Sequence, residues 1–221
     1  MEKKIKVAPS LLSFDFLHLD KEMKKIIAAK ADWIHLDIMD GLFVPNLSFG
    51  LPVVKSLQPC PIFKDVHLMI TNPHLYIAQF VESGADLITF HFESYRYKKD
   101  ILHTIKQIRQ LDTFVGISIK PNTPIEAILP YLKKIDVVLI MSVEPGFGGQ
   151  KYMNIATQKI QFLREYIDKN HLDCLIEVDG GINQETTKIV KKAGVDVIVA
   201  GSYLADDLIK QKIADMKNPL K

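Results

Sequence analysis

The sequence predicts an α/β protein that folds as a single (β/α)8 TIM barrel over residues 1–221. Short runs rich in β-branched residues alternate with longer segments of helical periodicity, which is the pattern of βαβ units around a parallel sheet. We count eight such units in the chain, whereas a doubly wound open sheet, the main alternative, usually has about five or six strands. No Pro-, Gly- or Ser-rich linker divides the chain, so we expect one domain.

The expected elements follow from this alternation of hydrophobic periods. Strands are expected at residues 4–9, 32–39, 62–69, 86–92, 113–119, 136–143, 174–179 and 195–201. Helices are expected at residues 15–29, 51–58, 74–84, 99–111, 125–135, 155–170 and 184–194, and in the tail from Tyr203. Ser202, directly before that tail, has a side chain typical of a helix N-cap.

Charge and composition exclude several classes of protein. The formal net charge is only +2 and the Lys and Arg residues are scattered, so we expect no binding to nucleic acid. No stretch is long and apolar enough for a membrane span, and neither end resembles a signal peptide or a targeting motif, which favours a cytoplasmic protein. Cys60 and Cys174 lack the spacing of a metal or redox site, and a reducing compartment is the default.

Polar side chains alternate with apolar ones along the expected strand 32–39. Successive side chains on a strand point to opposite faces, so His35, Asp37 and Met39 share a face with Trp33. The outer face of a barrel meets the helices and must be apolar, so the polar face is expected to point inward. Polar groups there belong near the carboxyl ends of the strands, where barrel active sites lie.

Other strands repeat this arrangement. His67 follows Asp65 at two residues on the third strand, and Asp179 follows Glu177 on the seventh. Each of these side chains has an ordinary explanation on its own, because a buried His is usually hydrogen-bonded to a neighbour and Asp65 is more typical of an ion-pair partner than of a ligand. His91 on the fourth strand either contacts a substrate or supports another side chain.

Four side chains lie late on their strands and point inward: His35, Asp37, His67 and Asp179. Without an ion or a substrate they would leave a group of buried polar atoms unsatisfied. Two imidazoles and two carboxylates suit one divalent transition metal ion, Zn²⁺, Fe²⁺, Mn²⁺ or Co²⁺, and mixed N and O ligation does not choose among them.

Three glycine-containing segments follow the last three strands: EPGFGG at 144–149, DGG at 179–181 and AGS at 200–202. Glycine lets the backbone approach a ligand, and successive N–H groups form an anion-binding nest. One such glycine is equally typical of a tight turn. Three adjacent loops indicate a phosphate site, which barrels commonly build after strands seven and eight. The GFGGQ segment also has the glycines of a mobile lid.

Over essentially its whole length the sequence resembles the ribulose-phosphate 3-epimerase family. The matching segments, in family order, are VAPSLLS, HLDIMDGLFVPNLSFG, DVHLMI, GADLITFHFES, PNTP, MSVEPGFGGQKYM, EVDGGIN and VIVAGSYL. The resemblance implies a metal-dependent isomerase of the pentose phosphate pathway that interconverts D-ribulose 5-phosphate and D-xylulose 5-phosphate. Two bases would transfer the proton at C3 through a metal-stabilised enediolate. The resemblance also implies a homo-oligomer, either a dimer or a hexamer.

The same resemblance implies roles for individual residues. Asp37 and Asp179 are the implied acid/base pair, and with His35 and His67 they are the implied ligands of one divalent metal ion. The implied substrate contacts are Ser10, Met39, His67, Met69 and Met141. The implied phosphate contacts are Gly146, Gly148, Gly149, Gly180, Gly181, Gly201 and Ser202.

Other functions stay open at this point. A sister group acts on D-allulose 6-phosphate, and the intact GFGG and DGG segments favour the pentose phosphate over it. A phosphosugar lyase or decarboxylase on the same barrel would require an inward lysine, whereas Lys64, next to Asp65, is expected to point outward. A sugar-phosphate sensor would not need the complete set of acids. Lys120 and Tyr203 depart from the family pattern, and we expect neither to touch the chemistry.

Overall fold

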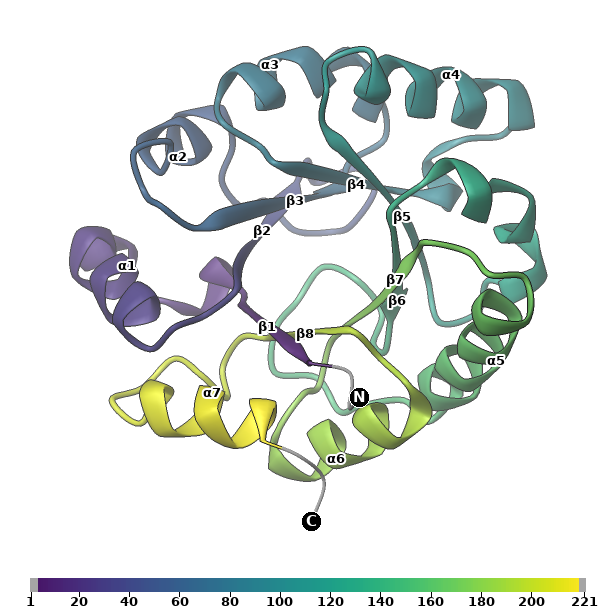
Figure 1. Cartoon of the computed structure of the whole chain (residues 1–221). Helices are drawn as coiled ribbons and strands as arrows, with labels where there is room; N and C mark the ends of the chain where they lie inside the picture. Colours follow the sequence, from purple (N-terminus) through teal and green to yellow (C-terminus); the bar gives the residue numbers. More distant parts are fainter. Residues whose placement is uncertain (1–3, 219–221) are drawn as a thin grey trace.

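The computed structural model describes residues 4–218 as one parallel eight-stranded sheet surrounded by helices (Figure 1). The strands are β1 (Lys6–Pro9), β2 (Trp33–Met39), β3 (Phe63–Met69), β4 (Leu87–His91), β5 (Phe114–Ile119), β6 (Val137–Met141), β7 (Leu175–Asp179) and β8 (Val197–Ala200). They pair in the order β1-β8-β7-β6-β5-β4-β3-β2, and a single parallel bridge between Ser10 and His35 joins β1 to β2. The sheet is therefore a nearly closed barrel, which confirms the predicted fold.

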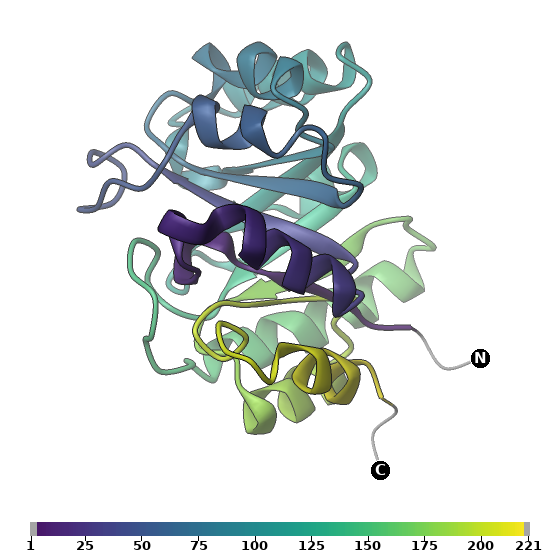
Figure 2. The ribbon, with the colours of Figure 1, turned by 90° about the vertical axis from the view of Figure 1, so that its left-hand side faces the viewer.

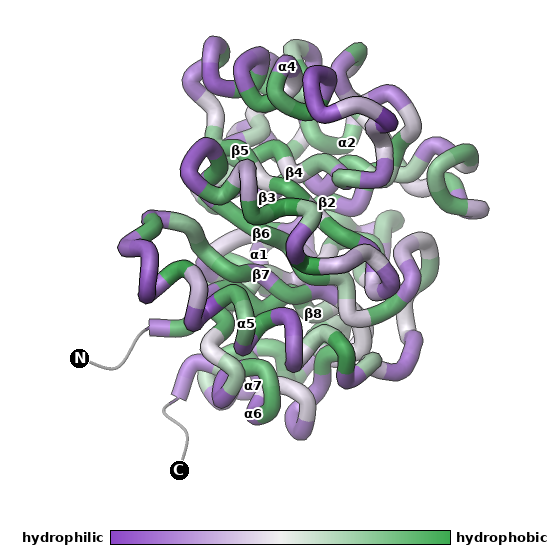
Figure 3. Tube along the Cα trace, turned by 90° about the vertical axis from the view of Figure 1, so that its right-hand side faces the viewer, coloured by the Kyte–Doolittle hydropathy of each residue, from purple (hydrophilic) through white to green (hydrophobic). Residues whose placement is uncertain are grey.

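The helices form the outer layer of the barrel (Figure 1). They are α1 (Leu19–Ala28), α2 (Leu51–Ser56), α3 (Ile77–Glu82), α4 (Lys98–Arg109), α5 (Ile155–Lys169), α6 (Gln184–Ala193) and α7 (Ile209–Lys217). Ile34, Leu36 and Ile38, which alternate with the polar residues of β2, are buried in the main apolar core. Because both faces of the strands are covered, the strand segments are mostly hydrophobic, as the colouring in Figure 3 shows.

The inside of the barrel changes from apolar to polar along the strands. Trp33, Leu87, Val137 and Val197 are the first residues of β2, β4, β6 and β8, and they pack in one apolar cluster. Alternate strands thus contribute one layer of inward side chains, as barrels of this type require. Two residues further along β2 the inward position is His35, which is fully buried. The apolar layer closes the amino-terminal end and leaves the polar groups toward the other end.

The prediction of an α-helix at residues 125–135 is wrong. This segment forms two 3-10 turns instead, η5 (Ile125–Ala127) and η6 (Leu129–Lys134). Pro130 lies in it, and proline has no N–H for an internal helical bond and clashes with the preceding turn. Further 3-10 turns precede two other helices, η2 (Phe16–His18) before α1 and η3 (Pro73–Leu75) before α3, where continuous helices were expected.

The last helix also begins later than predicted. α7 starts at Ile209 rather than at Tyr203, and its N-cap position is Leu208. The prediction that Ser202 caps this helix is therefore wrong. Ser202 instead lies in the turn that directly follows β8, at the barrel mouth.

The loop between β2 and α2, residues 40–50, projects from the barrel on the side away from both chain ends (Figure 2). Asp40 fixes the base of this loop, because its carboxylate accepts hydrogen bonds from the backbone N–H groups of Leu42 and Phe43. The same carboxylate accepts a bond of 2.7 Å from the N–H of Thr71, just after β3. The loop therefore begins at a fixed position beside the carboxyl ends of the strands.

No helix within residues 4–218 is long and apolar enough to cross a membrane. The terminal segments on which the targeting predictions rest extend into residues 1–3 and 219–221, which lie outside the described residues.

Candidate active site

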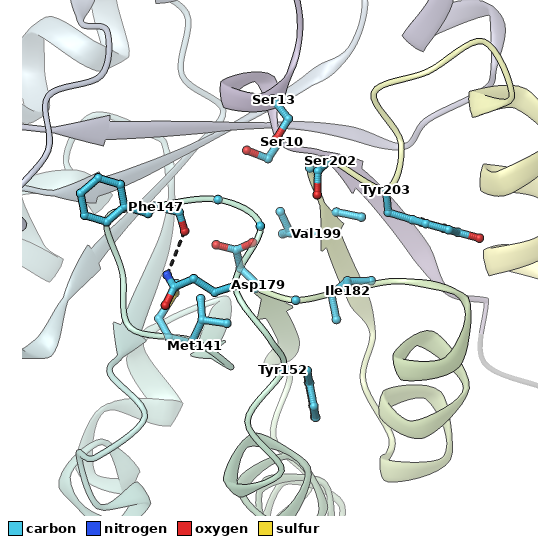
Figure 4. Close-up of a pocket in the computed structure, with 18 of the residues that line it drawn as sticks. Ser10, Ser13, Met141, Phe147, Tyr152, Asp179, Ile182, Val199, Ser202 and Tyr203 are labelled. Carbon is cyan, nitrogen blue, oxygen red and sulfur yellow. Dashed lines mark hydrogen bonds between the residues drawn. The ribbon is translucent and has the colours of Figure 1, made fainter.

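A cavity of about 700 Å³ opens at the carboxyl ends of the strands (Figure 4). The predicted site residues that line it are Ser10, Asp37, Met39, Met69, Met141, Gly146, Gly148, Gly149, Asp179, Gly180, Gly181, Gly201 and Ser202. The other two, His35 and His67, are fully buried and contact Asp37. The fold thus brings every residue that the sequence singled out for the site into one region.

His35, Asp37, His67 and Asp179 meet at the floor of this cavity. One donor atom from each lies within 4.8 Å of the other three. His35 Nε2 is 3.2 Å from His67 Nδ1, and Asp37 Oδ1 lies 3.3 Å and 3.1 Å from these two nitrogens. Two ring nitrogens that face each other so closely repel unless a proton or a cation lies between them. The donor set therefore fits a divalent ion with mixed N and O ligands.

The second ring nitrogen of each histidine has a buried partner. His35 Nδ1 is hydrogen-bonded to the carboxylate of Asp65, and His67 Nε2 faces His91 Nε2 at 2.9 Å. Such partners fix the tautomer and the orientation of a metal-binding imidazole. His91 contacts the far side of the His67 ring, away from Asp37, so it is placed to support His67.

Asp37 is held from several sides. Ser10 Oγ donates a 2.6 Å hydrogen bond to Asp37 Oδ2. Ser48 Oγ donates to the backbone oxygen of Asp37 and accepts from the N–H of Met39 at 3.0 Å, which ties the projecting loop to the end of β2. The carboxylate therefore has a defined orientation in the cavity.

Asp37 and Asp179 have opposite electrostatic environments. Burial opposes the charge of Asp37, but His35 and His67 outweigh it and hold the pKa of this carboxyl well below its usual range. Burial and the neighbouring charge of Asp37 raise the pKa of Asp179 to about 6. One carboxyl is thus firmly ionised and the other titrates close to neutrality, and such separation is typical of an acid/base pair.

A second group of buried acids lies against His35. Asp65 and Glu177 are fully buried, and each offers an oxygen within 4.8 Å of His35. Burial and the charge of Asp65 raise the pKa of Glu177 well above its usual range. Within this group, Asp65 supports the histidine through its bond to His35 Nδ1.

The segments after β7 and β8 form a glycine-rich wall of the cavity. Gly181 has a φ of +60°, and a Cβ there would lie 2.4 Å from the backbone N of Tyr152. α6 follows at once, and Asn183 caps it by accepting bonds from the N–H groups of Glu185 and Thr186. The exposed backbone N–H groups of a glycine-rich turn and the N-terminus of a helix both favour the binding of an anion.

Ser13 belongs to the same wall, although nothing in the strand pattern singled it out. A Cβ on Gly201 would lie 2.4 Å from Ser13 Oγ, so this hydroxyl reaches over the segment after β8 (Figure 4). Ser13 lies in the 3-10 turn η1 (Leu11–Ser13) after β1, where the alternation of strand faces carries no information. Its presence in the motif VAPSLLS was the available signal.

The structure also places Lys64, Lys120 and Tyr203 relative to the cavity. Lys64 Nζ donates to the backbone oxygens of Cys60 and Ile62, near the start of β3 and away from the cavity, as predicted. Lys120 Nζ lies 4.2 Å from the ring centroid of Phe43. Tyr203 borders the cavity beside the glycine-rich wall (Figure 4).

Comparison with known proteins identifies the family of this chain. The sequence profile of the ribulose-phosphate 3 epimerase family matches residues 6–205. The chain belongs to the ribulose-phosphate 3-epimerase family. It is 45% identical over 204 residues to ribulose-phosphate 3-epimerase of Mycobacterium tuberculosis (strain ATCC 25618 / H37Rv), which covers 91% of this chain and 87% of that protein. It is 43% identical to the ribulose-phosphate 3-epimerase of Bacillus subtilis (strain 168), covering 90% of this chain and 91% of that one.

Solved structures of other proteins share the fold of this family member. A mutant tryptophan synthase α-subunit from Pyrococcus furiosus superimposes with a TM-score of 0.70 at 17% identity, over 98% of this chain and 99% of that one. The 3-keto-L-gulonate-6-phosphate decarboxylase of Vibrio cholerae gives a TM-score of 0.71 at 14% identity, over 96% and 95% of the two chains. At such identities the likeness concerns the barrel alone.

Proposed function

We propose that this chain interconverts D-ribulose 5-phosphate and D-xylulose 5-phosphate by moving the proton at C3. The family assignment supports the reaction, and the observation that carries it is the pair Asp37 and Asp179 in one cavity with pKa values displaced in opposite directions. Epimerisation removes a proton from one face of the carbon and returns it to the other, so two groups on opposite sides are required.

Asp37 comes from β2 and Asp179 from β7, and the two strands are not neighbours in the sheet. A sugar bound between them would present its C3 to a carboxylate on each face. In one direction one group accepts the proton while the other donates, and the roles exchange in the reverse direction. Ser10, bonded to Asp37, would hold this carboxylate in line with C3.

The barrier to this reaction is the weak acidity of the C3 proton. The C–H is weaker than a carboxylic acid by about a dozen pK units or more, which corresponds to roughly 16 kcal/mol. We propose that His35, Asp37, His67 and Asp179 hold one divalent metal ion. When bound, this ion would supply Lewis-acid stabilisation of the negative charge that develops on the sugar oxygens.

The remaining walls would position the sugar and exclude water. The glycine-rich wall with Ser13 and Ser202 offers N–H and O–H donors to a phosphate remote from C3, whose binding would orient the reacting carbon. Met39 and Met69 pack with Val44 on one side of the cavity, and Met141 packs with Val143 on another. Apolar walls exclude water from the cavity, and electrostatic interactions inside it are stronger as a result.

Proton NMR of D-ribulose 5-phosphate in deuterated water, with the metal-reconstituted protein, tests this function. We expect loss of the C3 proton signal together with the appearance of D-xylulose 5-phosphate. Release of formaldehyde or carbon dioxide would favour a lyase or decarboxylase instead. Tight binding without C3 exchange would favour a sensor, and exchange restricted to D-allulose 6-phosphate would favour the hexose phosphate.

A further inference from the structure

A chain of buried polar groups leads away from the metal-ligand candidates at His67. His67 Nδ1 faces His35 and Asp37, while His67 Nε2 lies 2.9 Å from His91 Nε2. His91 Nδ1 in turn lies 3.1 Å from Glu93 Oε2. Both histidines are fully buried, so water does not compete for the contact between their rings.

For two neutral imidazole rings, the protons along this chain have one arrangement that satisfies every contact. An ionised carboxylate only accepts hydrogen bonds, so His91 must carry its proton on Nδ1 to donate to Glu93. His91 Nε2 then has a free lone pair and accepts from His67 Nε2–H. His67 therefore keeps its own proton on Nε2, and its Nδ1 lone pair is directed at the site.

Without this chain the opposite tautomer of His67 would be favoured. Asp37 Oδ1 lies 3.1 Å from His67 Nδ1 and would accept a hydrogen bond from a proton placed there. A proton on Nδ1 would block the nitrogen that a metal ion needs, since only the deprotonated nitrogen is a ligand. Asp37 thus favours a proton on His67 Nδ1, whereas Glu93, acting through His91, favours a proton on His67 Nε2.

Glu93 is itself fixed as an acceptor. Its Oε1 accepts from the backbone N–H of Lys120 at 2.8 Å and from the hydroxyl of Thr123, while Oε2 faces His91. Three donors thus converge on two oxygens. A glutamine has only one acceptor oxygen, and it cannot satisfy both the loop at 120–123 and His91.

The chain is also covered on its outer side. The ring of Phe43, from the projecting loop, lies 4.7 Å from the ring of His91 between centroids. Lys120 Nζ lies over the same Phe43 ring, 4.2 Å from its centroid. Lys120 thus packs over the aromatic side chain that covers His91.

We propose that Glu93 is a positioning residue that fixes, through His91, the tautomer of His67 whose Nδ1 is free. This inference rests on the proposed function only in that the free nitrogen would serve a metal ion. The tautomer itself is a property of the metal-free protein. An experiment can therefore contradict the tautomer proposal without contradicting the proposed function, and the reverse.

The test is the ¹⁵N NMR spectrum of the histidine rings in metal-free protein, held in a chelator near pH 7, for wild type and Glu93→Gln. In wild type we expect His67 and His91 to carry their protons on Nε2 and Nδ1 respectively. In Glu93→Gln we expect the His67 proton to move to Nδ1. Thr123→Val is the matched control, because it removes a donor to Glu93 Oε1 and leaves Oε2 on His91; its His67 tautomer should be that of wild type.

Zn²⁺ affinity, measured by competition with a chromophoric chelator, is the second readout. Loss of a supporting partner of a metal ligand typically weakens binding about 10–100-fold, and we expect such a loss in Glu93→Gln. Thr123→Val should stay within about threefold of wild type. If Glu93→Gln fails to fold, His91→Phe, which keeps an aromatic ring under Phe43 but cannot accept from His67, should show the same shift of tautomer.

An unchanged His67 tautomer in Glu93→Gln and His91→Phe would overturn the proposal. Equal losses of Zn²⁺ affinity in Glu93→Gln and Thr123→Val would also overturn it, since they would indicate a loosened loop at 120–123 in place of tautomer control. Failure of wild type to bind Zn²⁺ while showing the expected tautomers would contradict the proposed metal site and leave the role of Glu93 supported.

Discussion

Asp37 is the residue whose removal tests the acid/base role most simply. Asp37→Asn keeps the size of the side chain, so we expect the fold to survive while turnover is lost, with kcat at least about 1000-fold lower by steady-state assay. Asp173→Asn, at an exposed aspartate before β7, is the control and should retain wild-type activity. An Asp37→Asn variant that keeps more than about a tenth of wild-type kcat would rule out the role.

Asp179 makes the stability of the metal-free protein depend on pH. Its pKa is raised from 3.8 to about 6, mainly by burial, so the folded state favours the protonated form. This contribution is complete below pH 3.8 and is lost as the pH rises through 6. Relative to Asp179→Asn, metal-free wild type should therefore lose at most about 3 kcal/mol of unfolding free energy between about pH 4 and pH 7.

Urea unfolding of both proteins in a chelator, at about pH 4.5 and pH 7, measures this difference. A wild-type protein that gains stability over Asp179→Asn as the pH rises would contradict the assigned environment. Addition of a divalent ion at neutral pH should restore the stability of wild type, because the ion binds the ionised carboxylate of the folded state only.

Side chains on strands were predictable from the strand period, and the glycines of the loops were predictable from their motifs. His35, Asp37, His67 and Asp179 follow the two-residue period of a strand, which fixes the face on which each side chain lies. Ser13 and Glu93 lie in 3-10 turns after β1 and β4, where no such period exists. The motif VAPSLLS was the only sequence signal for Ser13, and the role of Glu93 follows only from its contacts in the folded chain.

At the scale of elements, the turn between β7 and α6 depends on Gly181. Alanine there would combine a φ of +60° with a Cβ 2.4 Å from the backbone N of Tyr152. We expect Gly181→Ala to destabilise the protein by about 1–3 kcal/mol and to raise the KM for the sugar phosphate about tenfold or more, measured by urea unfolding and steady-state kinetics. Gly50→Ala, where a Cβ meets nothing within 4 Å, is the control. A Gly181→Ala variant with wild-type KM would contradict a phosphate role for this turn.

The loop after β5 depends on a buried lysine of α5. Lys159 Nζ donates to the backbone oxygens of Lys120, Pro121 and Thr123, at 3.1, 2.7 and 2.6 Å. Lys159→Met would leave these oxygens without their donor, so we expect a loss of about 2 kcal/mol in unfolding free energy by urea titration. Lys169→Met, on the same helix but exposed, should change it by less than about 0.5 kcal/mol. Equal effects of the two variants would show that the buried bonds contribute nothing.

The type of each element was predictable where the hydrophobic period and the backbone preferences of the residues agreed. Every strand begins and ends within two residues of its predicted range, because β-branched runs flanked by turn residues permit few alternatives. The segment 125–135 has helical periodicity as well, but the backbone restriction of Pro130 prevents the α-helix.

At the scale of the whole molecule, the barrel explains why distant residues meet. Parallel strands that close on themselves place all carboxyl ends at one mouth, so residues far apart in the chain, such as Asp37 and Asp179, converge. The number of strand–helix units was enough to predict this closure. The sequence did not specify how the histidines pair with their supports, because that depends on distances between neighbouring strands.

We expect four side chains from three strands to hold one divalent ion inside the barrel mouth. Diffraction from crystals grown with Zn²⁺, recorded at the zinc absorption edge, tests it directly. We expect one anomalous peak bounded by His35 Nε2, His67 Nδ1 and the carboxylates of Asp37 and Asp179, at about 2.0–2.2 Å from each. A peak held instead by Asp65 and Glu177, or no peak in the cavity at saturating Zn²⁺, would contradict it.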